Sequence, residues 1–176
     1  MDAARLRSLQ GPLKEKYRTV PEAARVQARA EAALDPANLS CRVSAAGRVV
    51  EAGLHPAAGG DGTLACSADM LMQALAACAG VTLSAVATAM GVVLSRARIV
   101  AEAQWDARGT LGVDRTVPVG LTDVRLTFDL DTSADTATIE RLLATTERYC
   151  VILQTLRAPP TLSFELRQGM TGVSPD

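Results

Sequence analysis

One continuous run of small and apolar residues, LACSADMLMQALAACAGVTLSAVATAMGV from Leu64 to Val92, constrains the fold of this chain more than any other feature. Its length predicts a single long helix with Ser67 as the N-cap, Asp69 in the first turn and Gly91 at the end. Because a helix that is apolar on every side must be buried, we expect a core helix. The run is rich in Ala and contains polar residues such as Gln73, which favours this interpretation over a membrane span.

Small residues surround Cys78 within this run, among them Ala76, Ala77, Ala79 and Gly80. Small side chains allow another helix backbone to approach closely, and a helix this apolar has to find such a neighbour. The neighbour is either a second helix of the same chain or the same helix of a second copy. We therefore predict a homodimer.

The composition is that of a globular protein, with 176 residues, 48% hydrophobic, 21% charged and a net charge of −1. This length suits one domain. The near-zero charge and the 3% of aromatic residues provide neither the basic surface nor the stacking platform of a nucleic-acid-binding protein, so no such partner is expected. The N-terminus is polar and lacks the apolar region of a signal peptide, so we expect a cytoplasmic location and no membrane partner.

In the cytoplasm the cysteines of the chain are expected to be reduced. None of them forms a C-x-x-C pair, and His55 is the only histidine. Zinc sites usually combine several Cys and His ligands, so neither a metal site nor a bound cofactor is expected. The four cysteines are Cys41, Cys66, Cys78 and Cys150.

Residues 1–35 are predicted to form an N-terminal helical extension in two pieces. The sequence TVPE at 19–22 has the Thr-x-x-Glu spacing of a capping box, with Pro21 in the first turn. The second piece is expected to continue as a helix to Leu34. The sequence DPAN at 35–38 is then a turn that leads into the main domain.

Residues 36–176 are predicted to form one α+β domain. Alternating apolar residues indicate strands at 96–109 and 123–131, and residues 39–54 indicate a hairpin with its turn at Gly47. An amphipathic helix is predicted at 134–150, and a last strand at 159–167 with Leu162, Phe164 and Leu166 facing inward. This order of elements predicts antiparallel sheets that cover two central helices.

Two motifs in this domain resemble the OsmC/Ohr family, the osmotically inducible and organic hydroperoxide resistance proteins. DMLMQALAACAGVTL, which carries Cys78, resembles the long central helix of that family. ERYCVILQTL, which carries Cys150, resembles its CPV-x-x-TL signature. The resemblance extends over residues 39–166 and implies an intertwined dimer in which antiparallel sheets wrap around two central helices.

The resemblance implies a thiol-dependent peroxidase. The Cys78 thiolate attacks the O–O bond of an organic hydroperoxide and becomes a sulfenic acid, and Cys150 condenses with it to a Cys78–Cys150 disulfide. A dithiol reductant of the lipoyl type restores both thiols. The attack requires a thiolate, and a nearby thiol protects the sulfenic acid from further oxidation. An apolar pocket that favours organic peroxides is expected from Met70, Leu71, Met72 and Leu75.

The family also uses an Arg of the N-terminal hairpin and a Glu early in the central helix. Arg48 is the best match for the Arg, with Arg42 second. Ala68 stands where the family carries the Glu, and Asp69 follows it. At about 1.5 Å and 100° per residue, position 69 lies roughly 13 Å from Cys78 along the helix and on the opposite face. A carboxylate there could assist only the thiol of a neighbouring chain.

Two further features leave alternatives open. Val151 follows Cys150 where the family usually has Pro, which changes how Cys150 presents its sulfur. Cys66 precedes the long helix, a position that lowers the pKa of a thiol, so it is either a third redox thiol or a structural residue. The rival functions are a non-catalytic OsmC-like dimer that binds a small apolar ligand and a structural dimer with inert thiols.

Overall fold

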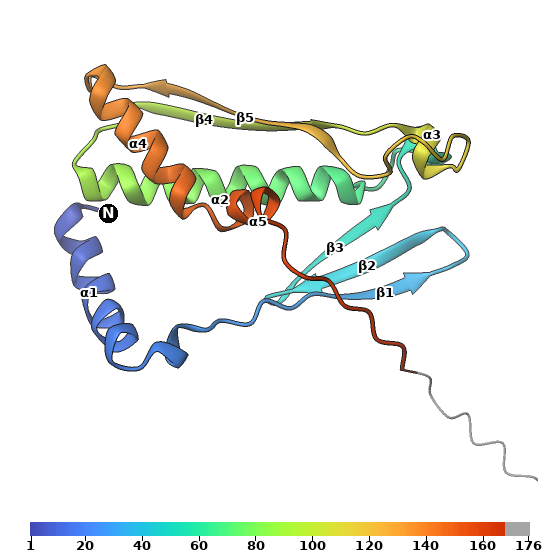
Figure 1. The fold of residues 1–176 in the computed structure, drawn as a ribbon, viewed down its shortest axis with the longest axis horizontal. Coiled ribbons are helices and arrows are strands. Elements are labelled where there is room, and N and C mark those ends of the chain that lie inside the picture. Colours follow the sequence, from blue (N-terminus) through green and yellow to red (C-terminus); the bar gives the residue numbers. More distant parts are fainter. Residues whose placement is uncertain (168–176) are drawn as a thin grey trace, which may run out of the picture.

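A single long helix, α2 (Ser67–Met90), runs along the centre of the molecule, and the other elements are arranged around it (Figure 1). The computed structural model describes residues 1–167. It contains two antiparallel sheets and several shorter helices, so the α+β prediction is confirmed.

The ends of α2 follow from the local sequence. Asp69 lies in the first turn, and Gly91 ends the helix with a φ of 71°, as predicted. A positive φ is readily adopted only by Gly, which explains the stop at this residue. The N-cap is Cys66 rather than Ser67, and its side chain makes no capping hydrogen bond. The predicted N-cap was therefore wrong by one residue.

One face of α2 is buried in the chain. Leu75, Ala79, Leu83 and Ala87 follow each other at intervals of four residues and form a continuous buried stripe. Other faces remain open, and Val81 is 73% exposed. Within residues 1–167, α2 is the helix long and apolar enough to cross a membrane, and 22% of its most apolar segment is buried. The predicted burial on every side is therefore not reached within one chain.

The first sheet has the order β1 (Glu31–Asp35), β2 (Ser40–Ala45) and β3 (Arg48–Gly53). The predicted hairpin is confirmed, with Ala46 and Gly47 at φ values of 49° and 74° in its two-residue turn. The predicted helix up to Leu34 was wrong, because Leu34 pairs with Cys41 in β1. The hydrogen bonds to β2 outweigh the helix preference of this Ala-rich segment.

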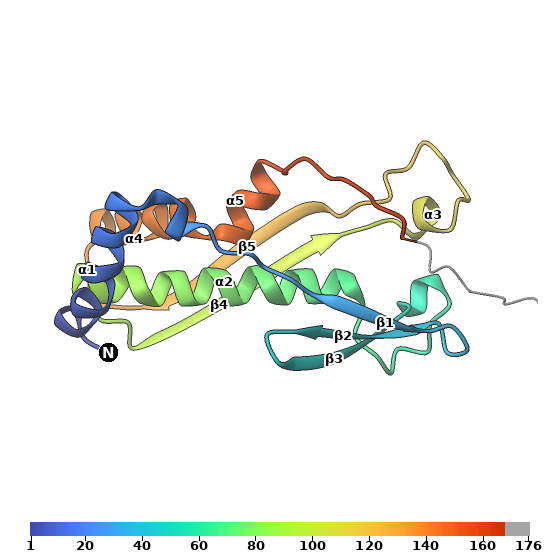
Figure 2. The same ribbon diagram turned by 90° about the horizontal axis from the view of Figure 1, so that it is seen from below.

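The N-terminal segment contains one α-helix, α1 (Ala3–Thr19), which packs against α2 near its C-terminal end (Figure 2). The predicted capping box is absent, because the Thr19 hydroxyl bonds carbonyls of α1. Pro21 instead opens the short 3-10 helix η1 (Pro21–Ala24). The second predicted helical piece is thus reduced to one turn.

The second sheet pairs β4 (Arg96–Gln104) with β5 (Thr122–Asp131). Between them lies the short helix α3 (Ala107–Thr110), and a 3-10 turn, η2 (Pro56–Ala58), precedes α2. The chain then forms α4 (Thr136–Tyr149) and α5 (Val151–Arg157). Helix α2 contacts β4, α4 and α5, which enclose the core.

Two of the predicted features near the C-terminus differ from the structure. Residues 158–167 form neither helix nor strand, because no strand within residues 1–167 hydrogen-bonds to them. Phe164 is consequently 96% exposed, with Leu162 and Leu166 similar. In α4, Leu142 and Thr146 are buried, as an amphipathic helix requires, whereas Tyr149 near its end is 61% exposed.

Candidate active site

Cys78 and Cys150 lie in the same part of the core, although the sequence places them on different helices. Cys78 occupies the middle of α2, and Cys150 links α4 to α5. Cys150 is completely buried with Leu75 and Ala79, and Cys78 packs against this cluster. Both are free thiols. The packing of α4 and α5 on α2 therefore brings the two predicted redox residues together.

The position of Cys150 follows from a sharp change of direction between two helices. Its φ of −74° and ψ of 103° are extended, so the helical path is interrupted at this one residue. Its N–H donates to the Thr146 carbonyl at 3.0 Å, and its carbonyl accepts from the Gln154 N–H at 2.9 Å. Cys150 thus ends α4 and begins α5. The chain makes this turn with Val151, without the proline of the related motif.

The environment of Cys78 favours its thiolate. Burial raises the pKa of this thiol, but the opposing hydrogen bonds outweigh burial and hold the pKa below its ordinary value. The donors are the Ile152 N–H, the Cys150 thiol, the Val151 N–H and the Thr82 hydroxyl. The first N–H groups of a helix have no partner within the helix, so those of α5 are free to bind the sulfur. A thiolate is the form that attacks a peroxide.

Cys150 has the opposite tendency. Burial raises the pKa of Cys150, and its hydrogen bond to Cys78 and the negative charge of that sulfur raise it further. The N–H groups of Leu153 and Ile152 only partly offset these effects. The site therefore contains one thiol whose pKa is lowered and one whose pKa is raised, which makes the two thiols chemically distinct.

The predicted arginine does not act on this pair within the chain. Arg48 begins β3 beside the hairpin turn, faces Ala45 across the strands and is exposed. Arg42 lies 3.9 Å from Glu51 in an exposed ion pair. The groups of residues 1–167 that shift the pKa of Cys78 come from α2 and from the Cys150–Ile152 segment, and neither arginine is among them.

The start of α2 holds the two residues considered as supporting groups. Asp69 is exposed in the first turn, and Ala68 beside it is half-buried. Cys66 is half-buried and lines an apolar cavity of about 380 Å³ with Leu71 and Trp105. None of these three residues is among the groups that act on Cys78 within residues 1–167.

The residues predicted to line a pocket beside Cys78 divide between the core and a separate cavity. Leu75 is fully buried, and Met72 packs against the cluster that contains Leu75. Leu71 faces the cavity at Cys66 instead. Leu75 and Met72 therefore share a cluster with Cys78, whereas Leu71 faces other surroundings, because successive helix positions point about 100° apart.

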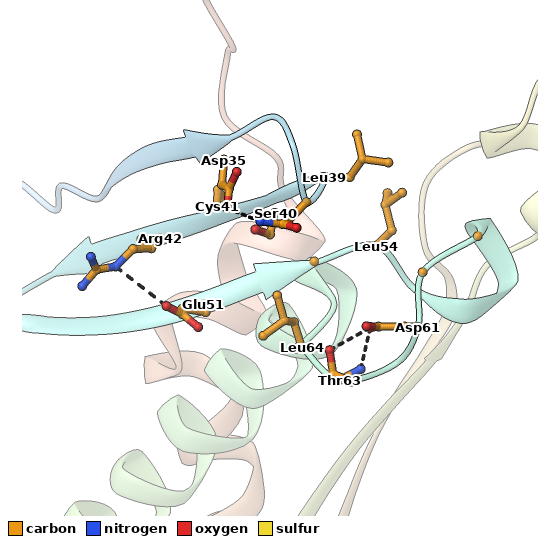
Figure 3. Close-up of a pocket in the computed structure, with 14 residues that line it drawn as sticks. Asp35, Leu39, Ser40, Cys41, Arg42, Glu51, Leu54, Asp61, Thr63 and Leu64 are labelled. Atoms are coloured by element: carbon orange, nitrogen blue, oxygen red, sulfur yellow. Dashed lines mark hydrogen bonds and ion pairs between the residues drawn. The ribbon is translucent and has the colours of Figure 1, made fainter.

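A larger hollow of about 540 Å³ lies between the first sheet and the loop before α2 (Figure 3). It contains Cys41 and the Arg42–Glu51 pair. Asp61 accepts hydrogen bonds from the N–H and the hydroxyl of Thr63, at 2.9 and 2.7 Å, which lower the pKa of that carboxyl. This is the geometry of a turn held by its own side chains.

Sequence reasoning missed three groups that bind the Cys78 sulfur, namely the N–H groups of Val151 and Ile152 and the hydroxyl of Thr82. The Thr82 position carried a signal, because residues four apart on a helix lie side by side. No sequence signal indicated the N–H donors of α5, because their contact with Cys78 depends on the angle between α4 and α5. Within residues 1–167, no group of three or more His, Cys, Asp or Glu could hold a metal ion.

Comparison with known proteins places the chain among proteins of this architecture. The OsmC-like protein of Mycoplasma pneumoniae matches with a TM-score of 0.64 and 16% identity, over 76% of this chain and 89% of that chain. An organic hydroperoxide resistance protein OsmC of Legionella pneumophila matches with a TM-score of 0.57 and 15% identity, over 77% and 92%. OhrB, an organic hydroperoxide resistance protein of Bacillus subtilis, matches with a TM-score of 0.52 and 15% identity, over 76% and 93%.

At these identities the structural matches establish the fold. No curated protein matches the sequence. The family model described as OsmC-like protein matches residues 60–165, which include both Cys78 and Cys150 and more than half of the chain. The chain belongs to the OsmC-like protein family.

Proposed function

We propose that this protein is a thiol-dependent peroxidase that reduces organic hydroperoxides. The observation that carries the proposal is the packing of Cys78 against the buried cluster that contains Cys150, together with the lowered pKa of Cys78. An easily ionised thiol beside a protonated one is the pair that peroxide reduction through a disulfide requires. The likeness to structures named organic hydroperoxide resistance proteins supports the same chemistry.

The proposed reaction begins with attack of the Cys78 thiolate on the outer oxygen of a hydroperoxide. The O–O bond breaks, the alkoxide takes up a proton and leaves as an alcohol, and Cys78 becomes a sulfenic acid. The Cys150 thiol then displaces the hydroxyl group as water, and the Cys78–Cys150 disulfide forms. A dithiol such as a lipoyl group restores both thiols by exchange, and itself becomes a disulfide.

Activation of Cys78 is proposed to come mainly from the donors of its own chain. Two N–H groups and the Thr82 hydroxyl bind the sulfur and stabilise its negative charge. This arrangement reduces the dependence on the family Glu, for which Ala68 is substituted here. Arg48 and Asp69 are proposed to contribute only from a partner subunit, since both lie on exposed surfaces of their own chain.

The functional form is proposed to be a cytoplasmic homodimer. Large apolar side chains are exposed on α2, the first sheet and the C-terminal segment, with Val81 at 73%, Leu34 at 77% and Phe164 at 96%. Exposed apolar surface on several elements is typical of an interface between subunits. A second copy would cover these surfaces and bring the hairpin arginine of one chain towards the thiol of the other.

A non-catalytic function, the binding of a small apolar ligand, is the second candidate. The cavity of about 380 Å³ at the start of α2 favours it, because Leu54, Leu71, Trp105 and Leu121 give it a mostly apolar wall. This volume lies within the range of small-molecule sites. In this case the Cys78–Cys150 pair would be a structural part of the core.

The test of the proposed function is turnover of cumene hydroperoxide by the full chain with dihydrolipoamide as the reductant. Wild-type protein is expected to consume the peroxide, and Cys78→Ser is expected to abolish this activity. Cys150→Ser should stop turnover after one cycle and leave a sulfenic acid on Cys78 that dimedone traps. Cys41→Ser is the matched control, because Cys41 lies in β2 away from the pair.

Unchanged turnover in Cys78→Ser would contradict the proposal. Wild-type protein that leaves the peroxide intact, yet binds an apolar fluorescent probe that Leu71→Asp no longer binds, would support the second candidate. Leu71 lines the cavity at Cys66 and makes no contribution to the pKa of Cys78, so the two candidates give different patterns.

A further inference from the structure

A set of side-chain contacts joins the two helices on either side of Cys150. The amide Nε2 of Gln154 in α5 donates to the main-chain carbonyl of Glu147 in α4, at 2.8 Å. The guanidinium of Arg157, one turn further along α5, lies 2.5 Å from the carboxylate of Glu147. One residue of α4 is thus held twice by α5, once through its main chain and once through its side chain.

These contacts matter because the end of α4 leaves main-chain carbonyls without helical partners. Cys150 bonds the carbonyl of Thr146, and Gln154 bonds the next one, that of Glu147. Both hydrogen bonds fix the angle between α4 and α5. A proline after the cysteine would restrict the chain at this point, and this chain has Val151 there. The angle is therefore held by side chains from both helices.

We propose that Glu147, Gln154 and Arg157, together called the elbow clamp, are positioning residues that hold the Cys150 sulfur at Cys78 for disulfide formation. Cys150 is the one residue between the two clamped helices, and its main chain is extended. A change in the helix angle moves its sulfur directly. This inference deepens the proposed function and rests on it for its role in the peroxidase cycle.

The clamp acts on a competition between two reactions of the Cys78 sulfenic acid. In the first, the Cys150 thiol attacks the Cys78 sulfur, the disulfide forms and water leaves. In the second, another hydroperoxide molecule oxidises the sulfenic acid to a sulfinic acid and is itself reduced to an alcohol. The second reaction inactivates the thiol. A correctly placed Cys150 sulfur speeds the first reaction and leaves the second unchanged.

The first experiment measures disulfide formation without any peroxide. The full chain is equilibrated in mixtures of reduced and oxidised glutathione, and peptide mass spectrometry determines the fraction with the Cys78–Cys150 linkage. Gln154→Leu is expected to lower the equilibrium constant about two- to tenfold, the effect of one lost hydrogen bond. Arg157→Met removes a more exposed contact, so a decrease of at most about fivefold is expected.

Two matched variants separate the clamp from general effects on α5. Arg157→Lys retains the positive charge and is expected to recover most of the wild-type constant. Thr155→Ala removes a different hydrogen bond of the same helix, from the Thr155 hydroxyl to the Val151 carbonyl at 2.8 Å, and should leave the constant unchanged. Equal constants for the wild type, Gln154→Leu and Arg157→Met would overturn the inference.

A second experiment links the clamp to the cycle. With excess cumene hydroperoxide, Gln154→Leu and Arg157→Met are expected to accumulate several times more sulfinic acid on Cys78 than the wild type. A merely structural role would not change this partition in the well-folded variant Arg157→Met, whose side chain is largely exposed. If the wild type does not react with peroxide, the proposed function fails, whereas the glutathione equilibrium still decides the inference.

Discussion

The Cys150 thiol donates a hydrogen bond to the sulfur of Cys78, and this contact shifts the two pKa values in opposite directions. The donor stabilises the thiolate of its neighbour and is itself made harder to ionise by the resulting negative charge. The two thiols therefore differ in acidity in the reduced protein. This difference depends on the angle at which α4 and α5 meet on α2.

Alkylation of the reduced protein should follow this difference in acidity. Cys78 is expected to react with iodoacetamide at a lower pH than an ordinary thiol, because its pKa is lowered, and Cys150 should react last. Mass spectrometry of the labelled peptides measures the order in which the thiols are alkylated. The experiment covers pH 6 to pH 10, because this range brackets the ordinary thiol pKa of about 8.5. Simultaneous labelling of both thiols would contradict the expected order.

The same shifts affect stability with opposite signs. The lowered pKa of Cys78 contributes stability above the pKa of the unfolded state, and this contribution is lost as the pH falls through the folded pKa. The raised pKa of Cys150 contributes stability below the unfolded pKa, which is lost as the pH rises through the folded value. Because the two effects oppose each other, alkylation is the more direct measurement.

Val151→Pro is expected to slow the alkylation of Cys78 at neutral pH about two- to tenfold, the effect of one hydrogen bond. Proline has no N–H, so the variant loses one donor to the Cys78 sulfur, and the pKa of that thiol rises. The first position of a helix tolerates proline, so α5 should persist. Val151→Ala keeps the N–H and serves as the control. Equal rates in Val151→Pro and Val151→Ala would show that this donor is unimportant.

Thr82→Val is expected to have a similar effect from the other side of the sulfur. The variant removes the hydroxyl that lowers the pKa of Cys78 while keeping the shape of the side chain. Thr82→Ser retains the hydroxyl and should restore the rate. The measurement is the pH dependence of thiolate absorbance in the Cys150→Ser background, where Cys78 is the remaining thiol of the pair. If Thr82→Val leaves the pH dependence of thiolate absorbance unchanged, the Thr82 hydroxyl does not lower the pKa of Cys78.

The sequence predicted those parts of the fold that depend on local pattern. Gly91 ends α2, Gly47 turns the hairpin, and alternation marks β5 and β4 as far as Gln104, since each signal lies within a few residues. The predicted strand at 96–109 was too long, because Ala107–Thr110 form the helix α3. The prediction of a helix at residues 31–35 was wrong, because an Ala-rich segment has helix preference. Only the pairing of this segment with β2 makes it a strand. Long-range contacts decide such segments, and a local pattern cannot report them.

The candidate site likewise has residues that sequence motifs predict and contacts that they cannot predict. Cys78 and Cys150 could be proposed from two motifs, and the structure places them together. The donors of Val151 and Ile152 depend on a helix angle, and the residues predicted as one apolar wall point to different surroundings. The role of Arg48 cannot be derived from one chain, because the residue is exposed and its proposed target belongs to a second copy.

Gly60→Ala is expected to destabilise the protein by about 2 kcal/mol or more, as a backbone clash does. A Cβ at this position would lie 1.8 Å from the Leu54 carbonyl oxygen, so the loop before α2 would have to move. Gly120→Ala is the matched control, because nothing lies within 4 Å of its Cβ and its φ is not positive. This variant should change the free energy of unfolding by less than about 0.5 kcal/mol. Thermal melting of both variants measures the contrast, and equal effects would contradict it.

Val81→Glu is expected to convert the proposed dimer to a monomer. Val81 lies on α2 one turn after Cys78 and is 73% exposed in the single chain, on a helix whose apolar surface is otherwise incompletely covered. A carboxylate buried in an interface costs several kcal/mol, which is comparable to the effect of losing a central contact residue. Size-exclusion chromatography with light scattering measures the mass.

Val113→Glu provides the control, because Val113 is 72% exposed in the loop between β4 and β5, outside the helix. It should leave the mass of the dimer unchanged. If the uncharged variant Val81→Gln also gives a monomer and weakens turnover, while the Cys78–Cys150 equilibrium in glutathione stays normal, a group from the partner subunit assists the thiolate, as proposed for Arg48. Monomeric wild-type protein with full peroxidase activity would instead show that one chain contains the complete site.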